Sequence, residues 1–188
     1  MENAVNIETY RFADDGAVPN SALPLVVYRG ALPDTGDRAA FCEKMFARNG
    51  WPGAWRNGIH PYHHYHSTAH EVLGIARGHA RVRLGGENGQ SIELHEGDVV
   101  VIPAGVAHKR EAASRDLLVI GSYPRGQDPD MCRAEPAQYE RTDHARANHD
   151  RTAHDGAAAR IATVPLPASD PVTGGAAPLL ECWQALPA

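Results

Sequence analysis

The sequence predicts an all-β domain, a barrel or sandwich of short strands with helices at its flanks. Short apolar or alternating runs recur between residues 60 and 123, separated by turns that contain glycine or proline, a pattern typical of such folds. The clearest turn is the glycine-rich segment 85–89, where Asn88-Gly89 favours a type I′ hairpin. A length of 188 residues fits one domain with additions at both ends.

Residues 1–57 are expected to pack on the β-core as two strands followed by a helix. Alternating or apolar character indicates the two strands, at residues 6–12 and 23–28. Pro24 places the second strand at a sheet edge or a strand start. Apolar residues at helical spacing follow Asp37, which can cap the helix, and Asn49-Gly50 is expected to end it.

The β-core is expected over residues 58–124, and residues 125–188 are expected to pack on it as a helix and an extended tail. Residues 137–160 are polar, rich in alanine and free of proline, which favours a surface helix. Residues 161–164 are predicted to form a last strand. Residues 179–183 are apolar enough to dock on the body of the domain.

The composition argues against several classes of protein. The net charge is −5 and the pI is near 6.1, so a basic surface for nucleic acid is not expected. The apolar runs are too short to span a membrane, and the first residues lack the basic and apolar regions of a signal peptide. Three widely spaced cysteines form no CxxC motif, which favours a reducing, cytoplasmic setting.

Two spaced motifs bring together residue types that bind metal ions. The first is Gly58, five residues, His64, one residue, His66, four residues, Glu71, six residues and Gly78. The second is Gly97, five residues, Pro103, one residue, Gly105, two residues and His108. On a strand, His64 and His66 share a face and Tyr65 points the other way. Imidazole and carboxylate groups suit Fe, Mn, Ni, Cu, Co or Zn, and buried in an apolar interior they need a cation as partner.

These motifs resemble those of the cupin superfamily (RmlC-like), small β-barrels that hold one metal ion. The first family motif, G(x)5HxH(x)3–4E(x)6G, is matched by residues 58–78 at every fixed position. The second, G(x)5PxGxxH(x)3N, is matched by residues 97–108, and its final Asn is replaced by Ala112. Residues 64–75 and 164–183 also look like the YjlB-like branch of the family.

The resemblance implies a cupin barrel, a double-stranded β-helix or jelly roll, with a mononuclear metal centre. Its ligands would be His64, His66, Glu71 and His108, and the ion would be a divalent transition metal, Fe, Mn, Ni or Zn. Because four protein ligands leave a coordination position open, the resemblance implies a metal-dependent enzyme of dioxygenase type acting on a small organic molecule. Glu71 would stay a ligand or swing off to act as a catalytic base. Edge-strand pairing, common in this family, implies a homodimer through the N-terminal strands or residues 179–183.

Two other functions remain open. One is a non-redox isomerase or hydrolase in which the ion acts as a Lewis acid. The other is a non-enzymatic small-molecule-binding or structural cupin, for which a small or filled barrel interior is expected. The substrate, the reaction and the native metal do not follow from the motifs.

Several other histidines and aromatic residues compete for the site. His60 shares the parity of His64 although Pro61 follows it, so His60 or His70 is an alternative ligand or a pocket acid/base. Five aromatic residues can line a pocket but are expected more often in a core: Trp51, Trp55, Tyr62, Tyr65 and Tyr123. Three late histidines recur at five-residue steps, which splays them around a helix and argues against a second metal site: His144, His149 and His154.

Overall fold

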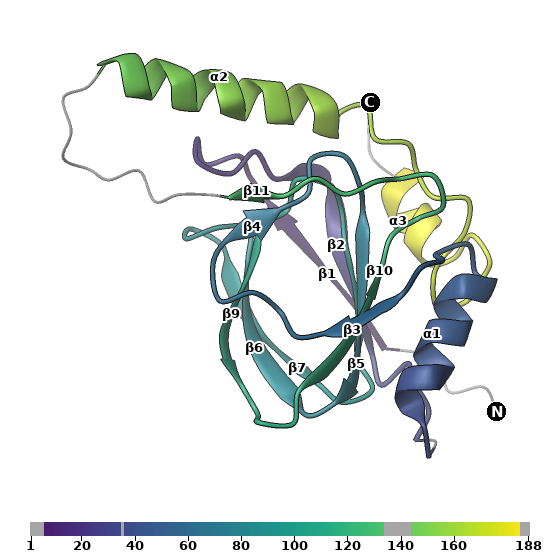
Figure 1. Ribbon diagram of the computed structural model, residues 1–188. Helices are drawn as coiled ribbons and strands as arrows, with labels where there is room; N and C mark the ends of the chain where they lie inside the picture. The colour runs from purple at the N-terminus through teal and green to yellow at the C-terminus, as the bar shows by residue number, and fades with distance from the viewer. Residues whose placement is uncertain (1–5, 35, 134–143, 185–188) are drawn as a thin grey trace.

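The computed structural model describes residues 6–34, 36–133 and 144–184, and its strands form two antiparallel sheets (Figure 1). The first sheet has the order β1 (Asn6–Phe12), β2 (Ser21–Arg29), β8 (Val99–Ile102), β5 (Glu71–Arg77), β10 (Leu118–Ser122) and β3 (Trp55–Asn57). The second has the order β11 (Cys132–Arg133), β4 (His64–Tyr65), β9 (His108–Ala113), β6 (His79–Leu84) and β7 (Gln90–His95). The predicted all-β fold is therefore confirmed, as a sandwich of two sheets and not a continuously bonded barrel.

The burial pattern of each strand follows from what covers its two faces. Strands β5 and β8 are buried on both faces, because one face meets the second sheet and the other meets helix α1 (Arg38–Arg48) or the core around it. Strand β6 alternates between exposed and buried residues, because its outer face meets solvent. The core between the sheets contains residues from both, among them Leu25, Leu73, Val82 and Val100. Burial of these apolar side chains supplies the main stabilising contribution.

Helix α1 begins and ends at the residues expected from the sequence. The Asp37 carboxylate accepts a hydrogen bond from the Ala40 amide at 2.9 Å, and Asn49 caps the other end. The helix lays Cys42 and Phe46 against β5 at Gly74. A Cβ at Gly74 would lie 2.5 Å from the Cys42 sulfur, so the glycine lets helix and strand approach closely.

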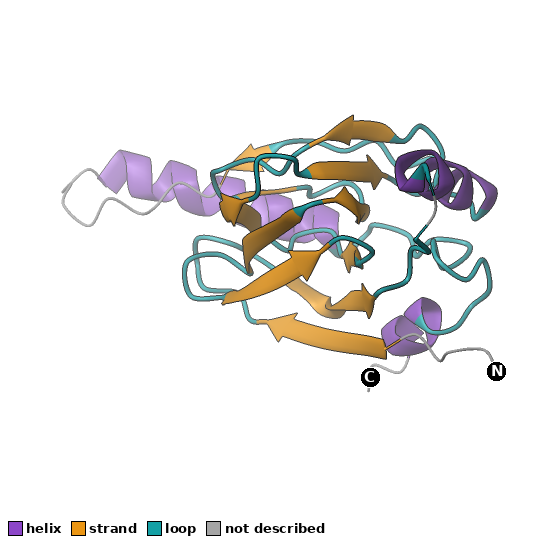
Figure 2. Ribbon diagram, turned by 90° about the horizontal axis from the view of Figure 1, so that it is seen from below, coloured by secondary structure: helices purple, strands orange, loops and turns teal. Residues whose placement is uncertain are grey.

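The C-terminal part forms helices α2 (His144–Ile161) and α3 (Leu179–Gln184). Figure 2 shows α1 and α3 beside the strands at one end of the molecule and α2 apart from both. The strand predicted at residues 161–164 is wrong, because Ile161 still belongs to α2 and a turn follows, closed by a hydrogen bond from the Val164 amide to the Ile161 carbonyl. No described helix is long and apolar enough to cross a membrane.

One buried carboxylate, that of Asp170, anchors the C-terminal segment to the sheet. It accepts hydrogen bonds from the Tyr28 hydroxyl at 2.6 Å and from the Leu179 amide at 3.1 Å. It also accepts from two neighbouring amides, those of Val172 and Thr173. Beyond this anchor Leu179 and Trp183 are buried, and the Trp183 indole donates to the Pro24 carbonyl at 2.8 Å. The apolar side chains of residues 179–183 therefore pack largely against the sheet of the same chain.

We expect Asp170→Ala to lower the free energy of unfolding by about 3–5 kcal/mol, because it leaves a buried hydroxyl and several amides without an acceptor. Urea unfolding followed by circular dichroism measures this. Asp155→Ala, at an exposed position of α2, is the control and should change stability by less than about 0.5 kcal/mol. A loss below about 1 kcal/mol for Asp170→Ala would contradict the anchoring role.

Candidate metal centre

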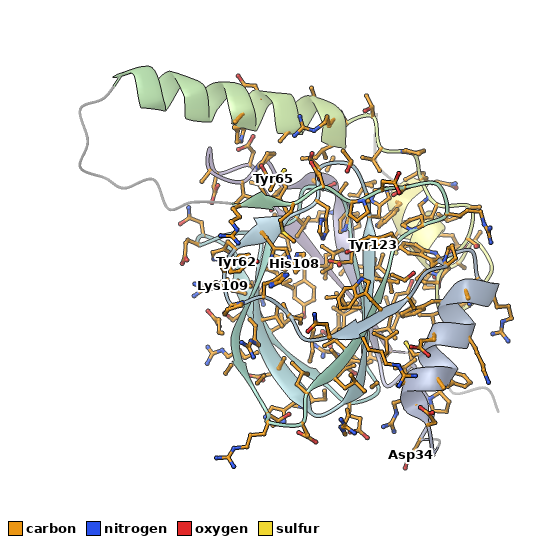
Figure 3. All side chains as sticks on the ribbon, viewed as in Figure 1. Asp34, Tyr62, Tyr65, His108, Lys109 and Tyr123 are labelled. Atoms are coloured by element: carbon orange, nitrogen blue, oxygen red, sulfur yellow. The ribbon has the colours of Figure 1, made fainter. Side chains whose placement is uncertain are left out.

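Strands of both sheets bring the four motif residues together. His64 on β4 pairs directly with His108 on β9, and their rings lie 4.0 Å apart. His66 follows β4 by one residue, and Glu71 is the first residue of β5 in the other sheet. All four side chains are buried. In Figure 3 His108 lies between the two sheets, whereas Lys109, the next residue on β9, lies at the outer side.

The three histidines bring their ring nitrogens close together. Each of His64, His66 and His108 offers a ring nitrogen, and these atoms lie within 4.8 Å of one another. Each Nδ1 atom lies beside a backbone carbonyl oxygen, those of Tyr62 (3.2 Å), Asp130 and Val106 (3.5 Å) respectively. A carbonyl beside Nδ1 favours the tautomer that carries its proton there and leaves the Nε2 lone pair free for a metal ion.

Glu71 completes the donor set. Its Oε2 atom lies 3.1 Å from Nε2 of His108, and its Oε1 atom lies 3.6 Å from Nε2 of His66. Oε1 also accepts a hydrogen bond from the Tyr123 hydroxyl at 3.0 Å. Oε2 is buried and receives no hydrogen bond of normal geometry from the described residues. An orphaned carboxylate oxygen beside three imidazole lone pairs fits a divalent cation, which would satisfy all of them.

The environment sets protonation states that suit a metal ion. Burial, with the nearby His108 ring, lowers the pKa of His64 to about 3, so this imidazole is neutral at neutral pH. Burial alone would raise the pKa of Glu71, but the neighbouring His108 and His66 rings lower it overall, so the carboxylate is ionised. Burial would lower the pKa of His66, but the Glu71 carboxylate raises it overall.

A cavity of about 140 Å³ opens directly onto these side chains. Four apolar residues form much of its wall: Trp55, Ile59, Leu73 and Met131. The Trp55 ring lies on β10 at Gly121, where a Cβ would come within 2.0 Å of it. The glycine therefore makes room for this wall of the cavity, whose inner end is the histidine cluster.

The alternative ligands His60 and His70 lie outside the group of three histidines. His60 is exposed and lines the cavity, and its ring stacks on Tyr62 at 4.9 Å, outside the group of three histidines. Tyr62 lies between His60 and Arg133 and does not line the cavity. His70 is buried against Trp183, and its Nδ1 atom accepts a hydrogen bond from the Ala104 amide at 2.9 Å. Its burial lowers its pKa to about 4. His70 is therefore a core histidine that faces away from the site.

Two of the five aromatic candidates, Tyr123 and Trp55, line the cavity. Trp55 also packs against the core between the sheets, and Trp51 and Tyr65 are buried in core clusters. The signal for Tyr123 is strand register, because Ser122 on β10 pairs with Val72 on β5 and the next position lies opposite Glu71. Burial, and then the charge of Glu71, raises the pKa of Tyr123, so the phenol keeps its proton.

The late histidines form no second cluster within the described side chains. His154 on α2 contacts Asp14 at 3.0 Å and lies near Asp155. The side chains of His144 and His149 lie outside the described part of the chain. Among the residues described, the three histidines of the cavity are the one group with the proximity that a metal ion needs.

We expect Tyr123→Phe to weaken metal binding about tenfold, because hydrogen bonds that orient a ligand typically contribute this much. Competition with a chromophoric chelator measures the affinity. Tyr62→Phe is the matched control, since Tyr62 contacts the cluster through its backbone carbonyl and the edge of its ring, which the variant retains. Equal affinities for the two variants would show that Tyr123 does not orient Glu71.

Comparisons with known proteins agree with a cupin fold. The family model described as "Cupin domain" matches residues 52–120. The "Uncharacterized protein YjlB" of Bacillus subtilis (strain 168) is 44% identical over 177 residues, which cover 94% of this chain and 96% of the relative. Among solved structures, acireductone dioxygenase from Bacillus anthracis with a cadmium ion is 17% identical, with a TM-score of 0.36 over 67% of this chain and 82% of that one.

Procruciferin of Brassica napus is 16% identical with a TM-score of 0.35, covering 59% of this chain and 23% of the globulin. Both solved structures are too distant for any of their properties to be transferred. The close relative, in contrast, extends over nearly the whole chain, including the flanking segments as well as the two motifs. On that basis the chain belongs to the cupin family, and within it to the group of proteins like YjlB.

Proposed function

We propose that this protein is a mononuclear metal-dependent enzyme of dioxygenase type that acts on a small organic molecule. The observation that carries the proposal is the convergence of three imidazole nitrogens and the Glu71 carboxylate at the inner end of a cavity. His64, His66, Glu71 and His108 would hold one divalent Fe, Mn, Ni or Zn ion. When bound, the ion supplies Lewis acidity and an open coordination position.

The chain's own residues would prepare the site for this chemistry. The backbone carbonyls beside each Nδ1 atom keep the three rings oriented, and Tyr123 holds Glu71 by its Oε1 atom. The apolar wall keeps bulk water from the reacting centre. In a dioxygenase reaction both atoms of O₂ enter the organic product, so O₂ itself is the oxidant and no further reductant is required.

A non-redox isomerase or hydrolase is the second candidate, and the contact of Tyr123 with Glu71 favours it. A protonated phenol and an ionised carboxylate beside a cavity can act as an acid and a base. A non-enzymatic cupin, the third function, is expected to have a small or filled interior. The interior here is not filled, because a cavity of about 140 Å³ reaches the histidines.

Oxygen consumption separates these candidates. Protein freed of metal is loaded in turn with Fe(II), Mn(II), Ni(II) or Zn(II) and screened against small organic acids, thiols and enols with an oxygen electrode. The proposal predicts uptake of O₂ in step with product for at least one redox-active metal, and none for His108→Ala. Product formed with Zn(II) in the absence of O₂ would support the non-redox enzyme and contradict the dioxygenase.

We also propose that the protein forms a homodimer and that it resides in a reducing, cytoplasmic compartment. The free outer edge of β1 supports the dimer, since β1 ends its sheet and pairs with β2 alone among the described strands. Cys42, Cys132 and Cys182 are free thiols, which supports the compartment.

We expect light scattering to give a mass of about twice the 20.3 kDa of one chain, because pairing would cover the exposed strand edge. The measurement is made after size-exclusion chromatography at several protein concentrations. A mass of 20.3 kDa throughout would contradict the dimer.

A further inference from the structure

We infer that the molecule bound in this cavity is a compact monoanion with a short apolar body, held by its anionic group at the open side of the metal centre. The inference rests on the proposed function, since it takes the divalent ion as given. It goes further by naming a substrate class from the charge, the size and the wall of the cavity.

The charge of the site selects a monoanion. Among the described residues that line the cavity, Glu71 is the one acidic residue and none is lysine or arginine. Two cations near the cavity are engaged elsewhere, because Lys109 contacts Glu87 at 3.3 Å and Arg133 lies over the Tyr62 ring. A divalent ion and one carboxylate leave a net charge of about +1 in a buried site, and one further negative charge neutralises it.

The same charges of the lining residues argue against other classes of ligand. A dianion such as a phosphate monoester would bring a second negative charge with no basic side chain to receive it, although such groups are usually bound by arginine or lysine. A cation would be repelled by the ion. A neutral molecule would leave the buried positive charge uncompensated.

The size of the cavity limits the body of the ligand. Its volume is about 140 Å³, close to the roughly 150 Å³ of an engineered apolar cavity that binds benzene. A ligand of about six to eight non-hydrogen atoms would fill it. A longer molecule would extend out of the cavity through its mouth, where His60 is exposed and Met131 is 50% exposed.

The wall favours an apolar body. Trp55, Ile59, Leu73 and Met131 present carbon atoms to the cavity, while the polar ligands gather at its inner end. A bound molecule would therefore place its charged group inward and its hydrocarbon part against these side chains. Each buried methylene group should then strengthen binding about fourfold, until the chain leaves the cavity.

Calorimetric binding of simple acids to the Zn(II)-loaded full-length protein tests the inference. The probes are acetate, butyrate, hexanoate and octanoate, with butylamine, butanol and succinate as controls for charge. We expect the dissociation constant to fall roughly fifteenfold from acetate to butyrate, which differ by two methylene groups, and to level off by octanoate. The amine, the alcohol and the dianion should bind at least tenfold more weakly than butyrate.

A variant locates the binding in this cavity. Met131→Ala should weaken hexanoate about fivefold and leave acetate and the zinc content unchanged, because Met131 lies at the mouth. Leu166→Ala, which removes an exposed apolar side chain outside the cavity lining, is the control and should change neither acid.

The possible outcomes separate the inference from the proposed function. Protein that holds one zinc ion per chain but binds no carboxylate, or binds butylamine or succinate as tightly as butyrate, would overturn the substrate class and leave the metal centre standing. Equal affinities for all four acids would contradict the inference that the ligand has an apolar body. Protein that cannot be loaded with metal would overturn both the inference and the proposed function.

Discussion

His64→Ala is expected to abolish stable metal binding, whereas His63→Ala should leave it intact. The two neighbours are similarly buried, with 4% and 6% of their surface exposed. His64 faces the cluster, but His63 faces the other way and its Nε2 atom lies 3.0 Å from Glu87. Removal of residues that only orient a ligand typically costs 10–100-fold in affinity, so removal of a ligand should cost more than about 100-fold.

The pair of variants is measured by metal analysis after chelator-free gel filtration, with circular dichroism to confirm folding. The expected result is near-stoichiometric metal in wild type and His63→Ala, and almost none in folded His64→Ala. Equal metal content in both variants would show that the ion is bound elsewhere. Loss in both would mean that burial of this segment, and not coordination by His64, determines binding.

Gly105→Val is expected to prevent folding, with a destabilisation above about 4 kcal/mol. Gly105 has a φ of +94°, and a Cβ there would lie 2.2 Å from the Asn20 carbonyl oxygen and 2.7 Å from the Ile161 side chain. The backbone oxygen cannot move aside as a flexible side chain can. The Gly105 amide also donates to the His66 carbonyl at 2.8 Å, so the same turn supports the metal centre.

Gly53→Val is the matched control for Gly105→Val. Gly53 also has a positive φ, +74°, but no atom lies within 4 Å of a Cβ built there. Gly53→Val should therefore lower the free energy of unfolding only by the cost of the strained backbone conformation, about 1–3 kcal/mol. Expression level and urea unfolding compare the two, and equal stability would show that the close approach to Asn20 is unimportant.

Much of the fold could be predicted from local patterns. Residues 6–12 alternate and form β1, and Asp37 caps α1 as its position indicates. Where local sequence was ambiguous the prediction failed. Residues 161–164 are short and apolar enough for a strand, but the alanine-rich run before them extends α2 through Ile161. Here the helix prevails because its hydrogen bonds continue unbroken from the preceding turn.

The site was harder to predict than the fold because its members meet through pairing between distant strands. The motif spacing named four ligand candidates, and all four lie together. Tyr123 joins them only through the register of β10 on β5, which local periodicity does not contain. For His70 strand parity is the better guide, because adjacent residues on a strand face opposite ways and His70 does face away from Glu71, toward Trp183.

Metal analysis of the wild-type protein tests the central claim most directly. The protein is purified without chelator or added metal, and its metal content is measured by mass spectrometry before and after reconstitution with Fe(II), Mn(II), Ni(II) and Zn(II). The account predicts one divalent ion per chain, reached at the latest after reconstitution. A folded protein that retains no ion under any of these conditions would contradict it.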